Sequence, residues 1–238
     1  MHCPSCDSTH IVKNGIRDND KQNYRCQTCS RQFVENPSGH YRIDDETCAL
    51  VDRLLLERLP LAGIARAVQV SESWLHQYVN KKYAETPREI DSSILPEKEN
   101  LTPVIECDEM WSFVGEKWNK QWLWLAIDRD TRIILAAHIG DRGSSGAQGL
   151  WENIPTRYRS NAHFYTDYWE AYQTVIPSNQ HDAVGKHTGL TNHIERFNLT
   201  MRQRVSRLVR LSLSFSKKLE NHIGAIWYFI HYYNRSLV

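Results

Sequence analysis

The sequence lacks the features that mark membrane and secreted proteins. No run approaches the roughly 18 consecutive apolar residues of a membrane span, and the first residues, Met-His-Cys-Pro-Ser-Cys, do not resemble a signal peptide. Hydrophobic content of 41% and charged content of 24% are ordinary for a soluble globular protein. We therefore expect a cytoplasmic protein whose cysteines are reduced and available to metal ions.

The chain also has almost no net charge, at +1. That average argues against a nucleic-acid partner, but it hides a local asymmetry. The segment from Arg196 to Lys218 contains no acidic residue and carries these basic ones: Arg196, Arg202, Arg204, Arg207, Arg210, Lys217 and Lys218. Because a solvated helix face usually mixes both signs, this segment favours contact with phosphates over a merely solvated face.

The few cysteines follow a metal-binding pattern. Two C-x2-C pairs, separated by 19 residues, are formed by Cys3, Cys6, Cys26 and Cys29. Each pair can supply two thiolates to a tetrahedral zinc ion from one tight turn, which leaves no open position for water. The spacing predicts a structural zinc ribbon over residues 1–36, with a hairpin turn at Asn14-Gly15; four unrelated cysteines are the alternative. Cys48 and Cys107 are isolated, which indicates small core residues.

Residues 37–88 show helical periodicity. A first helix, capped by Asp44 or Asp45, would carry these residues inward: Leu50, Val51, Leu54, Leu55 and Leu59. Pro60 would begin a second helix, at 61–68, and Ser71 would cap a third, from 72 to about 83. The pattern fits a helix-turn-helix, although a generic three-helix bundle is an alternative. The outward residues predicted to contact DNA are Ser73, His76, Gln77, Asn80 and Lys81, with Lys82 beside them.

A proline-containing, charged stretch between Thr86 and Asn100 indicates a linker, which we place at residues 89–102. Beyond it, strands are predicted at 104–113, 121–127 and 132–139, joined by short polar turns as in an antiparallel meander. A helix to Asn153, a strand at 163–166, a helix at 168–174 and a long helix from about Leu190 follow. This order predicts an α/β ribonuclease-H-like domain over residues 103–238.

Acidic residues stand at three places in this predicted domain. Asp108 lies within the first strand, Asp167 ends the strand at 163–166, and Glu195 begins the long helix. Such hard oxygen ligands suit Mg²⁺ or Mn²⁺, although an edge strand with solvated acids is the alternative for the first of them. Strand alternation puts Glu106 on the face of Asp108 and Glu109 on the opposite face, and we expect both to be structural.

The long helix supports this prediction. Its buried stripe would consist of Ile194, Phe197, Met201, Val205 and Leu208. Arg202 falls on the same side of the helix as Glu195. The helix would therefore bring a basic residue to the site of the acidic ones.

Several segments resemble transposases of the insertion-sequence-1 family. They are residues 107–115, 166–172, 193–204 and 210–217, together with both C-x2-C pairs and the predicted helix-turn-helix. The resemblance implies an Asp-Asp-Glu active site at Asp108, Asp167 and Glu195, with Arg202 as its basic residue. It also implies recognition of terminal inverted repeats by the N-terminal modules. In many members the two halves are joined by translational frameshifting, whereas here one frame encodes both.

The sequence therefore predicts a DNA transposase. Two Mg²⁺ or Mn²⁺ ions at the acidic residues would support cleavage of a 3′ end by water and attack of the freed hydroxyl on target DNA. Arg202 and the basic residues Arg196, Arg204, Arg207 and Arg210 would position phosphates. We expect a homo-oligomer on double-stranded DNA, associated with the nucleoid. The alternatives are a DNA-binding regulator and a nuclease of the same fold that cuts without joining.

Overall fold

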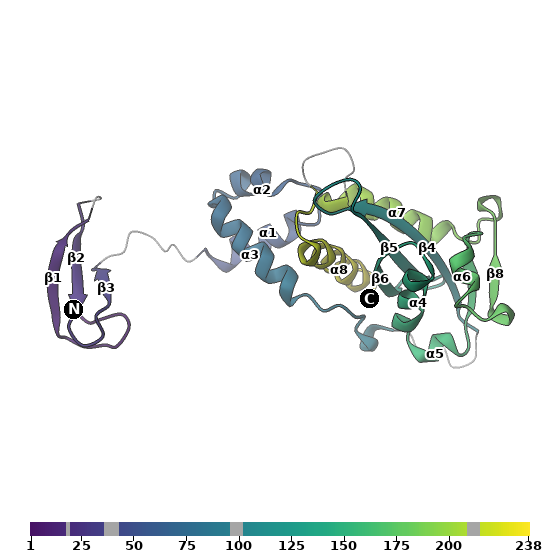
Figure 1. The fold of residues 1–238 in the computed structure, drawn as a ribbon, viewed down its shortest axis with the longest axis horizontal. Helices are drawn as coiled ribbons and strands as arrows, with labels where there is room; N and C mark the ends of the chain where they lie inside the picture. Colours follow the sequence, from purple (N-terminus) through teal and green to yellow (C-terminus); the bar gives the residue numbers. More distant parts are fainter. Residues whose placement is uncertain (18–19, 36–42, 96–101, 209–214) are drawn as a thin grey trace. The chain divides into compact units, whose positions relative to one another are not determined.

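The structure is a computed structural model that describes residues 1–17, 20–35, 43–95, 102–208 and 215–238. The chain forms two compact units, Met1–Asp45 and Glu46–Val238. Figure 1 shows the elements of each. In the part of the chain that is described, no helix has the length and apolar content needed to cross a membrane.

The N-terminal unit is a three-stranded antiparallel sheet. Its strands are β1 (Ile11–Ile16), β2 (Gln22–Cys26) and β3 (Gln32–Val34), in the order β1-β2-β3. The predicted turn at Asn14-Gly15 is wrong, because both residues lie within β1. Gly15 has φ of 79° at a shift in the β1–β2 register, so this glycine serves an irregularity in the strand. The chain reverses later, where the Arg17 N–H donates to the Lys21 carbonyl over 2.9 Å.

The predicted helices are α1 (Asp45–Leu54), α2 (Leu61–Ala67) and α3 (Glu72–Glu85), and apart from Asp45 they belong to the second unit. Pro60 precedes α2, and the Ser71 hydroxyl accepts a hydrogen bond from the Trp74 N–H over 3.2 Å at the start of α3. Both predicted helix starts are therefore confirmed. Whether the three helices act as a helix-turn-helix stays a prediction.

The predicted inward face of α1 is partly wrong. Val51 and Leu55 are buried, but Leu50 and Leu59 are each 38% exposed. Helix α1 ends at Leu54 and Arg58 has a positive φ of 54°. Helical periodicity therefore does not extend to Leu59, and Leu56 is buried instead.

Helices α1 to α3 share a hydrophobic core with the last helix, α8 (Leu219–Arg235). Helix α3 packs directly on α8 at Gly224, where an added Cβ would lie 2.4 Å from the Tyr83 Cβ. Only glycine permits so close an approach. The predicted domain boundaries at 36, 88 and 102 stay predictions, but these helices pack against C-terminal residues rather than among themselves alone.

A mixed five-stranded sheet forms the centre of the second unit. Its strand order is β6-β5-β4-β7-β8, made by β4 (Val104–Phe113), β5 (Lys120–Asp128), β6 (Ile134–Gly140), β7 (His163–Thr166) and β8 (His181–Ala183). Strands β4, β5 and β6 are antiparallel, which confirms the meander, while β4 and β7 are parallel. The short, polar β8 was not predicted. The mixed α/β class is confirmed, and the ribonuclease-H-like fold stays a prediction.

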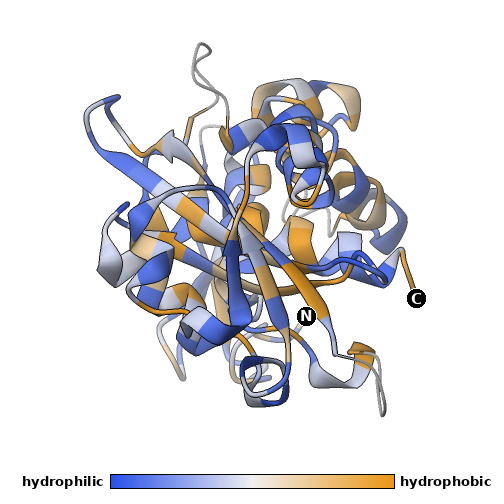
Figure 2. Cartoon of the chain, turned by 90° about the vertical axis from the view of Figure 1, so that its right-hand side faces the viewer, coloured by the Kyte–Doolittle hydropathy of each residue, from blue (hydrophilic) through white to orange (hydrophobic). Residues whose placement is uncertain are grey.

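Helices cover both faces of the sheet. Met110, Leu123 and Leu125 pack towards α7 (Asn192–Arg204) and α8, while Ile105 and Trp124 pack in a second core with α4 (Ser144–Asn153). The short helices α5 (Thr156–Arg159) and α6 (Glu170–Gln173) flank β7 in sequence. Hydrophobic residues, drawn in orange in Figure 2, accordingly occur along the central strands. All five residues of the predicted stripe from Ile194 to Leu208 are buried.

Candidate active site

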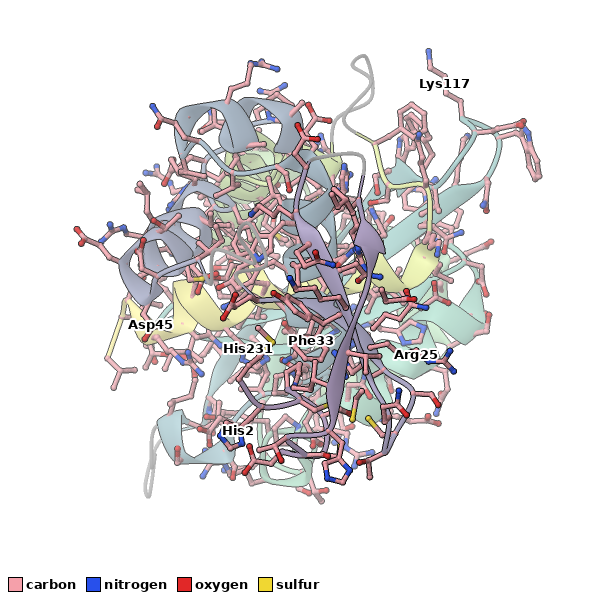
Figure 3. All side chains as sticks on the ribbon, turned by 90° about the vertical axis from the view of Figure 1, so that its left-hand side faces the viewer. His2, Arg25, Phe33, Asp45, Lys117 and His231 are labelled. Carbon is pink, nitrogen blue, oxygen red and sulfur yellow. The ribbon has the colours of Figure 1, made fainter. Side chains whose placement is uncertain are left out.

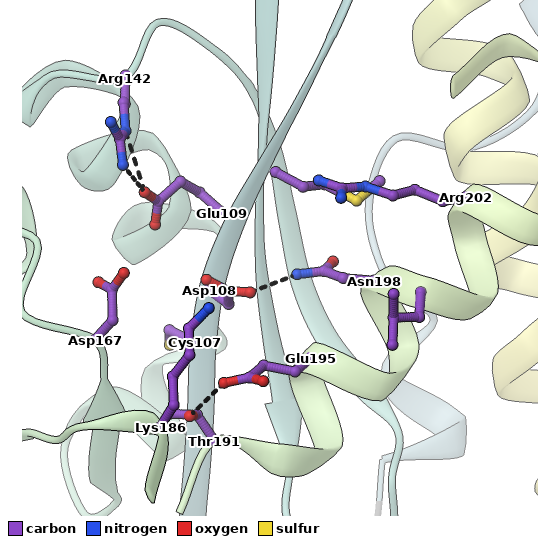
Figure 4. A pocket seen from close by; sticks show the side chains of 12 residues that line it. Cys107, Asp108, Glu109, Arg142, Asp167, Lys186, Thr191, Glu195, Asn198 and Arg202 are labelled. Atoms are coloured by element: carbon purple, nitrogen blue, oxygen red, sulfur yellow. Dashed lines mark hydrogen bonds and ion pairs between the residues drawn. The ribbon is translucent and has the colours of Figure 1, made fainter. Parts of the chain in front are cut away.

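A pocket forms where β4 continues beyond its pairing with β7. The parallel pairing covers Val104 to Glu106, so β4 has no β7 partner from Cys107 onwards. Helix α7 contacts β4 in this region. The pocket is lined by Cys107, Asp108, Glu109, Met110, Arg142, Asp167, Lys186, Thr191, Glu195, Asn198, Leu199 and Arg202 (Figure 4). All four predicted catalytic residues therefore line one pocket.

Three carboxylates meet at this pocket. Asp108, Glu109 and Asp167 each have an oxygen within 4.8 Å of the others. Asp167 directly follows β7, and its carboxylate accepts a hydrogen bond from the Trp169 N–H over 2.9 Å, which orients it. Glu109 lies on the face of β4 opposite Asp108, as predicted, yet its carboxylate still reaches the other two acids. At this open edge both faces of β4 reach the pocket.

Glu109 is held by other side chains. Its carboxylate accepts hydrogen bonds from Arg142, at 3.1 and 3.3 Å, and from the Tyr172 hydroxyl, at 3.0 Å. The Arg142 guanidinium lies 3.9 Å from the Trp169 ring centroid and 4.4 Å from that of Trp122. Burial and the charge of Asp167 raise the pKa of Glu109, while Arg142 and Tyr172 oppose the rise. Both oxygens of Glu109 therefore already have donors.

Asp108 is the most perturbed acid of the group. Burial, and then the charges of Glu109 and Asp167, raise its pKa to about 7. The Asn198 amide N–H donates to its carboxylate over 2.7 Å. The buried Asn198 Oδ1 has no hydrogen-bond partner among the described residues. Crowded carboxylates with a spare amide oxygen are a donor set that suits a divalent cation such as Mg²⁺ or Mn²⁺.

Glu195 and Arg202 reach the same pocket from α7. Glu195 accepts a hydrogen bond from the Thr191 hydroxyl over 3.1 Å, and it is not among the three acids whose oxygens lie within 4.8 Å of one another. The Nε of Arg202 is buried and has no hydrogen-bond partner in the described part of the chain. Figure 4 shows both side chains, with Asn198 between them along the helix. An arginine donor left without a partner beside acidic groups suits a phosphate oxygen.

Glu106 has a structural position. It is fully buried, and its carboxylate accepts hydrogen bonds from the backbone N–H groups of His193, at 2.8 Å, and Ile194, at 3.0 Å. Arg129 lies 3.6 Å from its other oxygen. Burial raises the pKa of Glu106, and the two N–H groups oppose the rise. Glu106 therefore fixes the start of α7, the helix that carries Glu195, Asn198 and Arg202.

Several residues of this site, Asn198 and Arg142 among them, were not anticipated from the sequence. Asn198 follows Glu195 by three positions, so helical spacing could have placed it on the same side. Arg142 follows β6 in a loop, and no local pattern points to it. It reaches Glu109 because β4, β5 and β6 are neighbours in the sheet.

The predicted DNA-contacting residues lie in different surroundings. Arg196 is exposed, as are all five predicted α3 residues (Ser73, His76, Gln77, Asn80 and Lys81). Arg204 instead donates to Glu57 over 2.6 Å and to the Leu56 carbonyl over 3.1 Å, and it lies against the ring of Phe229. These internal contacts disfavour a role for Arg204 in DNA binding. Arg207 lines a second pocket, and Arg210 lies outside the described residues.

The four cysteines of the N-terminal unit converge as the spacing predicts. Their sulfur atoms all lie within 4.8 Å of one another, with Cys3 3.5 Å from Cys29 and Cys6 3.6 Å from Cys26. The side chains of this unit are drawn in Figure 3. Backbone N–H groups, that of Cys29 foremost, lower the pKa of Cys26 to about 6, which favours the thiolate form that binds zinc. Four convergent thiols fit a structural zinc ion.

Of the two cysteines predicted to be core residues, Cys107 is buried and Cys48 is only partly buried. The prediction of a core residue is therefore confirmed for Cys107 but not for Cys48.

Comparison with known proteins identifies the family of the second unit. Residues 103–234 match the family model described as IS1 transposase. The insertion element iso-IS1n protein InsB of Shigella dysenteriae is 36% identical over 127 residues, which are 53% of this chain and 93% of that protein. The insertion element IS1 4 protein InsB of Escherichia coli strain K12 is 31% identical over 145 residues, 61% of this chain and 83% of that protein.

A solved structure also aligns in part, from the simian T-cell lymphotropic virus intasome in complex with PP2A regulatory subunit B56 gamma. It has a TM-score of 0.32 and 13% identity over 59% of this chain and 54% of that chain, a likeness too small to define the fold. The family match, in contrast, covers more than half of the chain and includes every residue of the acidic pocket. The chain belongs to the IS1 transposase family.

Proposed function

We propose that this protein is an Asp-Asp-Glu DNA transposase that cleaves the 3′ ends of an insertion sequence and joins them to target DNA. The observation that carries the proposal is the convergence of Asp108, Asp167, Glu195 and Arg202 on one pocket. These residues come from two strands and a helix that are far apart in the sequence. A pocket shared by acids and by an arginine whose buried Nε has no hydrogen-bond partner among the described residues has an evident use in phosphoryl transfer and little use in a purely structural domain.

In this proposal Asp108, Asp167 and Glu195 would hold two divalent cations, Mg²⁺ or Mn²⁺. When bound, such ions activate the attacking oxygen and stabilise the leaving oxygen of an in-line displacement. Asn198 orients Asp108 through its 2.7 Å hydrogen bond, and Glu106 holds the start of α7. Arg202 binds a phosphate oxygen of the strand that is cut.

The outward residues of α3 (Ser73, His76, Gln77, Asn80 and Lys81) would contact the terminal inverted repeats, and Arg196, Arg207 and Arg210 would contact phosphates. The zinc-binding cysteines would keep the N-terminal unit folded for the same task. We further propose that several copies assemble on double-stranded DNA, in the cytoplasm and at the nucleoid.

Replacement of Asp108 by Asn tests the chemistry. We expect the Asp108→Asn variant to lose cleavage and joining while it still binds end DNA, because the charge that holds the cations is removed and the DNA-contacting residues are untouched. The assay incubates the protein with Mg²⁺, a labelled precleaved end and a plasmid. Mg²⁺-dependent cleavage retained by the variant would contradict the assignment of Asp108 as a catalytic residue.

The matched control is Asp182→Asn, which makes the same change at an exposed acid on β8, outside the pocket. It should retain the parent activity. The same gel separates the competing functions. Joined products indicate a transposase, products that are cut but never joined indicate a nuclease, and bound but intact DNA indicates a regulator.

A further inference from the structure

A second pocket lies between α3 and the start of α8. His76 and Asn80 line it from α3, and Arg207 lines it from the turn after α7. Lys217 and Lys218 line it just before α8, and Asn221 lines it from the first turn of α8. The Asn221 amide donates to the Asn80 side chain over 2.9 Å, so the two sides of the pocket are directly linked. The pocket therefore adjoins the α3 face that the proposed function assigns to DNA.

Positive charge dominates this pocket. Three cations line it and no acidic residue does, and within the described ranges none of the three forms an ion pair. Helix α8 begins after Lys218 without a side-chain cap, which leaves backbone N–H donors at this end. Glu220 stands in the first turn of α8 but does not line the pocket. Unpaired cations beside a helix N-terminus favour an anion.

The backbone that carries the two lysines is fastened to the central sheet. Ser216 is fully buried, and its hydroxyl hydrogen-bonds with the His222 Nδ1 at 3.1 Å, while the His222 Nε2 hydrogen-bonds with the Ser112 hydroxyl at 2.9 Å. The Gly115 N–H also donates to the Ser216 carbonyl over 2.8 Å. Lys217 and Lys218 therefore extend from an anchored segment that follows the end of β4.

We propose that this pocket binds backbone phosphates of the same DNA that α3 contacts. The inference rests on the proposed function, because the anion is identified as a DNA phosphate from the α3 residues that adjoin the pocket. Arg202 lines the acidic pocket and Arg207, five residues on, lines this one. A DNA backbone that passes from one pocket to the other meets an arginine at each, whereas a small free anion would need only one of them.

The strand between the two pockets sets an approximate spacing. Val114, which bridges to Ser216, lies six positions after Asp108 along β4 and its continuation. At about 3.3 Å per residue this is about 20 Å, which corresponds to about six base pairs at 3.4 Å per nucleotide of one strand. The phosphate in the second pocket should accordingly lie about six base pairs from the scissile one.

The test is a binding experiment with the Asp108→Asn full-length chain, so that no cleavage occurs. Fluorescence anisotropy with duplex end DNA, over a range of salt concentrations, compares this chain with one that also carries Lys217→Ala and Lys218→Ala. We expect about ten-fold weaker binding, from two exposed charge contacts. We also expect the slope of log affinity against log salt to shrink by about two. Ethylation interference should lose its signal about six base pairs from the scissile phosphate.

A control chain carries Arg157→Ala and Arg235→Ala, two exposed cations outside both pockets. It removes the same charge and should bind like the parent. Equal affinities and salt slopes for the lysine and control variants would overturn the proposal. The proposal would also be overturned if inorganic phosphate blocked DNA binding by competition and the ethylation interference pattern stayed unchanged. The pocket would then be a site for a free anion. Failure of the proposed function shows separately, as absence of Mg²⁺-dependent joining by the chain with Asp108 intact.

Discussion

Glu109 illustrates how the site depends on single residues. It adjoins Asp108 in sequence and in space, yet both of its oxygens accept hydrogen bonds from Arg142 and Tyr172. A carboxylate that is occupied in this way serves better to hold Arg142 in place than to bind a cation. Among the described residues, Asn198 is the only side chain that donates to Asp108, and burial and the charges of Glu109 and Asp167 raise the pKa of Asp108 to about 7.

We therefore expect Glu109→Gln to lower joining activity by about 10–100-fold, as is typical of residues that orient a metal site. Asp108→Asn should instead abolish it. Calorimetric titration with Mn²⁺ distinguishes the two roles, because Glu109→Gln should still bind Mn²⁺ and Asp108→Asn should bind it far more weakly. Equal loss of Mn²⁺ binding in both variants would make Glu109 a direct ligand.

At the scale of secondary-structure elements, His222 connects three parts of the fold. From α8 it hydrogen-bonds with Ser112 of β4 and with Ser216. Burial, and then the charge of Arg207, lower its pKa to about 4. The neutral ring is therefore the form that the fold accepts.

This depressed pKa predicts a pH dependence of stability. The unfolded chain takes up the His222 proton near pH 6.5 and the folded chain only near pH 4, so the unfolded state binds more protons between these values. Stability is then lost as the pH falls from 6.5 towards 4, by about 2 kcal/mol between pH 7 and pH 5. Urea unfolding at both pH values measures it.

The His222→Gln variant is the reference for this experiment, because glutamine does not titrate. Its stability should fall less than that of the parent between pH 7 and pH 5. Carboxylates contribute equally to both chains, so the difference belongs to His222. Identical pH dependence in the two chains would show that the ring does not titrate as its burial implies.

At the scale of the whole molecule, different forces stabilise each of the two units. Among its described residues, the N-terminal unit buries only Cys3, Asn23 and Cys26. So small a core favours a unit that is stabilised by a metal ion at its four cysteines, and we expect this ion to be zinc. The described residues of the second unit form two hydrophobic cores, so we expect this unit to fold without zinc.

Removal of zinc should therefore unfold one unit and spare the other. After treatment with a chelator, limited proteolysis should degrade the chain up to about Asp45 and leave a stable fragment that corresponds to Glu46–Val238. Mass spectrometry identifies the fragment. The Cys3→Ser, Cys26→Ser chain should give the same fragment without a chelator; an N-terminal unit that resists proteolysis in both cases would contradict a zinc-dependent fold.

The core that α1, α2 and α3 share with α8 also decides how the proposed DNA-binding half can be studied. A deletion of residues 1–88 would remove α1, α2 and α3 and expose the α8 surface around Gly224 that packs on Tyr83. Loss of sequence selectivity in such a chain would be mixed with loss of stability. A deletion that ends before Asp45 removes the cysteine unit alone.

Features of short range could be predicted from the sequence because neighbouring residues set them. The C-x2-C spacing predicted the meeting of four sulfur atoms, and Pro60 and Ser71 predicted helix starts. Helical periodicity predicted the buried stripe that begins in α7 at Ile194 and continues past its end at Arg204 to Leu208. The three acids of the predicted site could be singled out from the sequence because Asp108 lies within a predicted strand, Asp167 ends another and Glu195 begins a predicted helix. The turn at Asn14-Gly15 failed because the same dipeptide also suits an irregular strand.

Features that depend on distant neighbours were decided only by the tertiary structure. Alternation along β4 could not show that β7 ends early, and this open edge is what brings Glu109 beside Asp108. Nothing near Arg204 in the sequence indicates Glu57, which turns that arginine inward. Likewise, nothing in the sequence of α3 predicts that this helix packs against α8. Periodicity assigns a face to a side chain, but only the packed fold determines what that face meets.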